Sequence, residues 1–220
     1  MAIYFAGYLS PIRNKLGNAV GRKWRTLDVL SAYNGRPRNP RTVAQQVQRE
    51  HFKIASQLAL IFAPVIEMGY KATCEGTPLP PRAYFMRKNW GVITMNDDPV
   101  SGTIDATAIE FSQGSLLGVD VSGQISTATP LTVAQTLVSN AGVGNALATD
   151  EVYMFVYDKE AGAGIISDKK YRSDESVEII VPATWNGHRV CAYLITVGAA
   201  GTANEGKVSN SLCVGTGTIS

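Results

Sequence analysis

The sequence has few of the residue types that build metal and catalytic sites. Its two histidines, His51 and His188, lie far apart, and neither belongs to a set of four His and Cys residues at zinc-site spacing. The three cysteines form no Cys-x-x-Cys pair, which favours thiols kept reduced and packed as small apolar groups. The longest apolar run, Leu58 to Ile66, is much shorter than the roughly 20 residues that cross a bilayer. We therefore expect no metal centre and no membrane contact. The alternative that Cys191 and Cys213 meet on neighbouring strands is left open at this point.

Motifs for catalysis and nucleotide binding are also missing. There is no Gly-x-Ser-x-Gly elbow, and the Gly17 to Gly21 spacing is one residue too short for a P-loop. The pairs Asp97-Asp98 and Asp150-Glu151 are interpreted as solvated turn acids. His51 is interpreted as a helix-packing residue and His188 as a solvated loop residue. We expect no enzymatic activity, no catalytic residues and no cofactor.

Charge is divided unevenly along the chain, although the net charge is only +2. Residues 1–98 carry 14 Lys and Arg against 6 Asp and Glu, whereas residues 99–220 carry 6 against 12. Such asymmetry indicates that the basic half binds an acidic partner, either nucleic acid or the acidic half of a neighbouring copy. The first residues, MAIYFAGYLSP, lack the basic and long apolar regions of a signal peptide, so the protein is expected to stay in the cytoplasm that makes it.

One long amphipathic helix is predicted over about residues 42–62. Apolar or packing residues recur there at steps of three and four, at Val47, His51, Ile54, Leu58 and Ile61. Thr42 stands at the N-cap position with Gln45 three residues later, which is the spacing of a capping box. Pro64 and Gly69 interrupt the pattern, and a second, shorter helix is predicted within residues 82–94.

The remaining segments are predicted to be strands. Turns at Asn14-Lys15 and Gly17-Asn18 and short strands near residues 3–5 and 19–33 precede the long helix. After residue 102, short apolar segments alternate with Gly-rich turns, over 103–111, 116–125, 130–139, 152–157, 177–181, 189–197 and 208–214. That spacing predicts an antiparallel, immunoglobulin-like β-sandwich. The fold class is thus α+β, with a basic region at 1–98 and a sandwich domain at 99–220, divided near residues 95–102.

Basic residues before and at the start of the long helix are the candidates for contact with a protein neighbour or with DNA phosphates. They are Arg13, Lys15, Arg22, Lys23, Arg25, Arg36, Arg38 and Arg41. Trp24 lies among them, either as an anchor in a core or interface or as a platform for base stacking.

Two stretches resemble an uncharacterised protein family found in Bacteroidetes and in their crAss-like phages. The first contains GNAVGRKW at residues 17–24 and NPRTVAQ at residues 39–45, and the second contains VSNSLCVG at residues 208–215. The resemblance implies no catalytic residues.

The phage connection implies a structural virion component, a ring or connector subunit of the neck or tail, located in the virion after synthesis in the host cytoplasm. Its partners would be further copies of itself in a ring and other virion proteins, with non-specific contact to packaged DNA as a second role. A bacterial binding module for a carbohydrate or protein ligand is the alternative.

Overall fold

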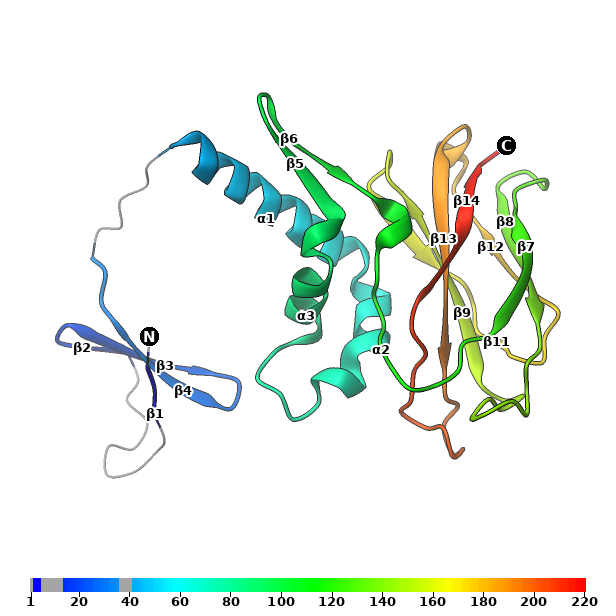
Figure 1. Cartoon of the computed structure of the whole chain (residues 1–220), viewed down its shortest axis with the longest axis horizontal. Coiled ribbons are helices and arrows are strands. Elements are labelled where there is room, and N and C mark those ends of the chain that lie inside the picture. Colours follow the sequence, from blue (N-terminus) through cyan, green and yellow to red (C-terminus); the bar gives the residue numbers. More distant parts are fainter. Residues whose placement is uncertain (1, 5–13, 36–40) are drawn as a thin grey trace.

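The computed structural model describes residues 2–4, 14–35 and 41–220. A small N-terminal sheet lies at one end of the molecule, a β-sandwich at the other, and three α-helices between them (Figure 1). The helices are α1 (Val43–Ile61), α2 (Ala63–Cys74) and α3 (Pro81–Lys88), with short 3-10 helices at Trp90–Val92, Ala106–Ala108 and Ala183–Trp185.

The strands form four antiparallel sheets in the described parts of the chain. The small N-terminal sheet has the order β1-β4-β3-β2, built from β1 (Ala2–Tyr4), β2 (Asn14–Leu16), β3 (Ala19–Trp24) and β4 (Leu27–Ala32). A hairpin pairs β5 (Ile93–Asp97) with β6 (Val100–Ile104). One sandwich sheet has the order β12-β8-β7, from β7 (Asp120–Ser126), β8 (Thr132–Val138) and β12 (Ser176–Ile180). The other has the order β10-β9-β13-β14, with β11 also on β9, from β9 (Glu151–Asp158), β10 (Ala163–Ile166), β11 (Lys170–Tyr171), β13 (Arg189–Val197) and β14 (Leu212–Thr218).

The long helix predicted over residues 42–62 is confirmed as α1, but its capping box is wrong. Thr42 is the N-cap residue with an extended backbone, yet its side chain makes no capping hydrogen bond. The Thr42 carbonyl instead accepts from the backbone N–H groups of Gln45 and Gln46. The buried side of α1 includes His51, Ala55, Leu58 and Ala59. Burial of one helix face rather than a side-chain cap therefore stabilises α1.

The break predicted at Pro64 is a bend of 91° between α1 and α2 directly before this residue, but the break predicted at Gly69 is wrong, because α2 continues through it. Pro64 occupies the first turn of that helix, where the missing N–H removes no helical hydrogen bond. Gly69 lies in mid-helix because a Cβ there would stand 2.2 Å from the Phe111 carbonyl oxygen. Residues 110–113 run along α2 at this point, and Tyr70 Oη donates to the Glu110 carbonyl at 3.0 Å.

Two further predicted segments need correction. The second helix ends at Lys88, earlier than predicted, and Trp90 belongs to a 3-10 turn. The strand predicted over 103–111 ends at Ile104, because Asp105 caps the following 3-10 turn by accepting from Thr107 N at 3.1 Å. Strands β10 and β11 were not predicted, since a Gly-rich turn signal covers the beginning of β10, and β11 has only two residues.

The α+β class is confirmed, and most of the predicted strands occur near their predicted positions. The small sheet contains the strands predicted on both sides of Trp24, and its β2–β3 turn uses Gly17 at φ +58° with Asn18. The turn predicted at Asn14-Lys15 is wrong, because both residues lie in β2. The finer immunoglobulin-like designation stays a prediction. The division near residues 95–102 also stays a prediction, and the structure places the β5–β6 hairpin there.

Strand β9 has apolar residues on both faces, as its pattern predicts. Val152, Met154 and Val156 face a core shared with the β12-β8-β7 sheet. Phe155 and Tyr157 face the helices, where Phe62 is fully buried and its ring centre lies 4.7 Å from that of Phe155. The sheet containing β9 is therefore a middle layer between the helices and the second sheet, and one apolar cluster joins residues before and after the predicted division.

Candidate assembly interface

The small N-terminal sheet carries most of the described basic candidates on its surface. Lys15, Arg22, Lys23 and Arg25 are exposed, and Arg25 has a positive φ of 51° in the two-residue turn between β3 and β4. Lys15 Nζ lies 3.7 Å from the centre of the Tyr33 ring. Arg41 is exposed just before α1. Arg13, Arg36 and Arg38 lie outside the described residues.

The same sheet exposes large apolar side chains. Leu16 is 65% exposed, Trp24 53% and Tyr33 44%. Trp24 is therefore not a core residue of this chain, and it remains a candidate for an interface or a stacking platform. Large apolar groups exposed beside several cations are typical of a binding surface rather than of an inert one.

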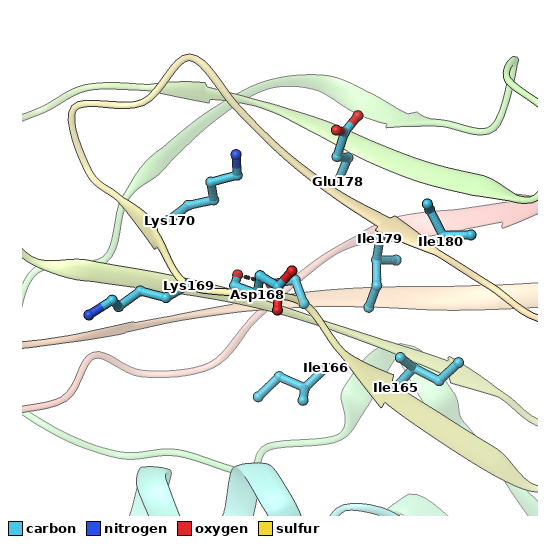
Figure 2. A pocket seen from close by; sticks show the side chains of 9 residues that line it. Ile165, Ile166, Asp168, Lys169, Lys170, Glu178, Ile179 and Ile180 are labelled. Carbon is cyan, nitrogen blue, oxygen red and sulfur yellow. Dashed lines mark hydrogen bonds between the residues drawn. The ribbon is translucent and has the colours of Figure 1, made fainter.

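The β-sandwich has a groove between the edges of its two sheets. It has a volume of about 410 Å³ and lies between residues 165–170, which include the end of β10, and residues 178–180 of β12. Figure 2 shows the isoleucines 165, 166, 179 and 180 on both sides of this groove, with Glu178 on β12 and Lys170 across from it. Ile180 is 78% exposed. This groove was not predicted, because β10 and β12 belong to different sheets and no local pattern shows that their edges lie close together.

A second pocket, of about 430 Å³, lies between α2 and the ends of the sandwich strands, lined by Met68, Lys71 and Val208 among others. In the described residues there is no cluster of three or more His, Cys, Asp or Glu side chains able to hold a metal ion. Within the same residues no single helix is long and apolar enough to cross a membrane; α1 and α2 pass that test only as a pair, bent by 91° at their junction.

A family model described as a family of unknown function (DUF6266) matches residues 11–215. The chain belongs to this family. A search of curated proteins finds no match. The matched span includes strands β2 to β4 with their basic residues, all three helices and both sheets of the sandwich. The basic sheet and the isoleucine-lined groove are therefore both parts of the DUF6266 region.

The interpretation of Asp150 as a solvated turn acid is wrong, because Asp150 belongs to a buried ionic network in this DUF6266 chain. Asp150 and Arg172 have fully buried side chains, with Arg172 Nη2 3.2 Å from Asp150 Oδ2. Arg172 also donates to the carbonyls of Leu117 and Gly118, at 2.6 and 3.1 Å, and to Asn140 Oδ1. Its Nε has no partner in the described structure. With Asn204, which donates to Asp150 Oδ1 at 3.1 Å, the network joins four separate loops of the sandwich, which supports a structural role.

The two histidines differ from each other in surroundings. His51 is 7% exposed and its ring stacks on Trp90 with centroids 3.8 Å apart, as the helix-packing interpretation requires. His188 is not simply solvated, because its Nδ1 lies 2.6 Å from the buried carboxylate of Asp158. This hydrogen bond raises the pKa of His188 above its ordinary value of 6.5. Only the 30-residue separation of the two partners hid this pair from sequence reasoning.

The cysteines are free and two of them are buried. Burial raises the pKa of Cys191 to about 11 and also raises that of Cys74 and Cys213. Cys191 and Cys213 lie on the paired strands β13 and β14, but Cys213 is in register with Tyr193 and Cys191 with Thr216. Thiols held protonated by burial are poor nucleophiles, so these side chains act as apolar packing groups.

Proposed function

We propose that this chain is a non-enzymatic structural subunit of a phage virion, a ring or connector component of the neck or tail. The observation that supports it most is the basic N-terminal sheet with exposed Leu16, Trp24 and Tyr33, at the opposite end of the molecule from the sandwich (Figure 1). The resemblance of GNAVGRKW and VSNSLCVG to a family with phage members gives the virion context.

Assembly into a ring requires that one surface of each copy meets a different surface on the next copy. The basic half of one copy can make such a contact with the acidic half of the next copy, and complementary charge sets the orientation of the two copies. Isolated surface charges contribute little to affinity, so the exposed apolar residues near them are expected to supply most of it. The charge division thus supports a contact between the basic half of one copy and the acidic half of another, and a ring needs this contact in its heterologous form.

Mass determination tests the proposal directly. Native mass spectrometry of the purified chain is expected to show closed oligomers, and particle imaging is expected to show rings. Mass spectrometry of purified virions should detect the chain. A strictly monomeric chain that is also absent from virions would overturn the proposal.

The groove of about 410 Å³ on the sandwich favours the alternative function, a bacterial immunoglobulin-like module that binds a carbohydrate or protein ligand. The two facing sheets, β12-β8-β7 and β10-β9-β13-β14, match the three and four strands of that class of sandwich in number, and β11 pairs with β9 in addition. A monomeric chain retained on immobilised glycans would support this alternative. Retention on DNA at low salt, lost at high salt, would instead show phosphate contact by the basic sheet.

A further inference from the structure

Strand β12 is an open edge of the sandwich. In the order β12-β8-β7 its only partner among the described strands is β8. The Glu175 carbonyl accepts from Leu137 N and Val181 N donates to the Leu131 carbonyl, so odd-numbered residues direct their backbone groups toward β8. In an antiparallel pair these directions alternate, so Ser176, Glu178 and Ile180 direct their N–H and C=O groups to the open side. Such an edge is a template for an added strand.

The open edge borders the isoleucine-lined groove. Residues 165–170 form its other wall, so the groove is a gap between two sheet edges rather than a covered core (Figure 2). A strand added to β12 would place alternate side chains into this gap and the others on the outer face beside Glu178. The groove therefore fits an extended strand with an apolar residue on one face and a cation on the other.

Acidic side chains predominate around this edge. Asp168, Glu175 and Glu178 are exposed, and none of them has an ion-pair partner among the described residues. Of the two nearby lysines, Lys169 is paired with Glu151 at 2.9 Å, and Lys170 is half-buried. A basic strand would thus meet a net negative surface.

Strand β2 of the small sheet has this pattern. It is the outer edge of the order β1-β4-β3-β2, and Leu16 is its most exposed apolar residue. Successive strand residues point to opposite faces of the sheet, so Lys15 and Leu16 lie on opposite faces. Lys15 is paired with Val20 of β3, and Arg22, two residues after Val20, lies on the same face as Lys15. When Leu16 enters the groove, Lys15 and Arg22 lie on the outer face, the face of Glu178.

We propose that the β12 edge of one copy accepts strand β2 of a second copy, which adds its β1–β4 sheet to the β12-β8-β7 sheet. Leu16 packs between Ile165 and Ile179 in the groove, and Lys15 and Arg22 face Glu178. The contact joins different surfaces of identical chains, so it propagates from copy to copy and closes into a ring when the rotation allows. This inference rests on the proposed function and names the two surfaces that carry it.

Charge exchange tests the contact. The variant Glu175→Arg/Glu178→Arg and the variant Lys15→Glu/Arg22→Glu are each expected to weaken self-association more than about tenfold, because like charges then face each other. The combination of all four changes in one chain should restore association. Asp120→Arg, an exposed change on β7 at the opposite edge of the same sheet, is the control and should leave association unchanged. The oligomer mass is measured by native mass spectrometry, and urea unfolding confirms that each variant folds.

Cross-linking supplies a measurement that does not depend on charge. A mixture of a Leu16→Cys chain and an Ile165→Cys chain should form a disulfide-linked dimer under mild oxidation, whereas either variant alone should not. Oligomers that persist in both charge variants, or a mixture without the cross-link, would overturn the β2–β12 contact and leave the proposed function intact. A chain that is monomeric at every concentration would overturn both.

Discussion

The residues that deviate most from their sequence interpretation are buried charges. Asp150 accepts from Leu147 N at 2.8 Å and is bonded by Asn204 as well as by Arg172. A buried ion pair adds little net stability compared with apolar residues of equal size, but removal of one partner leaves the other charge buried and unpaired. The pair is therefore a sensitive point in the sandwich.

Arg172→Met is expected to lower the free energy of unfolding by about 3–5 kcal/mol, because the Asp150 carboxylate would lose its counter-charge in a fully buried position. Urea unfolding measures the loss. Arg189→Met is the matched control, since Arg189 is exposed and donates to Thr216 Oγ1, and its cost should stay within about 0.5 kcal/mol. Equal losses in the two variants would contradict the structural role of Arg172.

His188 makes stability depend on pH. Its pKa is raised in the folded chain by the hydrogen bond to Asp158, so folding favours the protonated ring. The stabilisation is complete below the unfolded pKa of about 6.5 and is lost as pH rises through the higher folded pKa. The difference in unfolding free energy between the wild-type chain and His188→Gln should therefore be largest below pH 6.5 and shrink toward pH 9. Parallel curves over this range would show that the pair does not titrate as described.

At the level of secondary-structure elements, helix α2 depends on the segment that runs along it. Gly69 lets the Phe111 carbonyl approach the helix, and Thr73 Oγ1 donates to the Gln113 carbonyl at 2.9 Å one turn later. The absence of a side chain at one position thus decides how closely residues 110–113 pack on the helix.

Gly69→Ala should destabilise the fold by about 1–3 kcal/mol, although alanine is the better helix former, because its Cβ would overlap the Phe111 carbonyl and Ser112. Thermal unfolding followed by circular dichroism measures the change. Gly91→Ala is the control, since a Cβ at Gly91 meets nothing within 4 Å, and it should be neutral or slightly stabilising. A stable Gly69→Ala chain would mean that residues 110–113 move away at little cost.

Across the whole molecule, burial is concentrated around Phe62 and within the sandwich. Phe62 ends α1 and contacts aromatic rings from α3, from residue 111 and from strands β9 and β13. The helices are therefore a layer of the same body as the sandwich, while the small basic sheet presents its apolar residues outward. Of these outward residues, Leu16 is the one that the proposed contact between copies would bury, and that contact would join opposite ends of two neighbouring molecules (Figure 1).

Local patterns were enough to predict α1, the strands beside Trp24 and most sandwich strands, because helix period, strand alternation and Gly-Asn turns act over a few neighbouring residues. The basic character of the N-terminal region also follows from composition alone. Helix α2, the Arg172–Asp150 pair and the groove beside β12 could not be predicted in this way. Each depends on residues that are distant in the chain, such as Gly69 and Phe111, and only tertiary packing brings them into contact and removes water from between them.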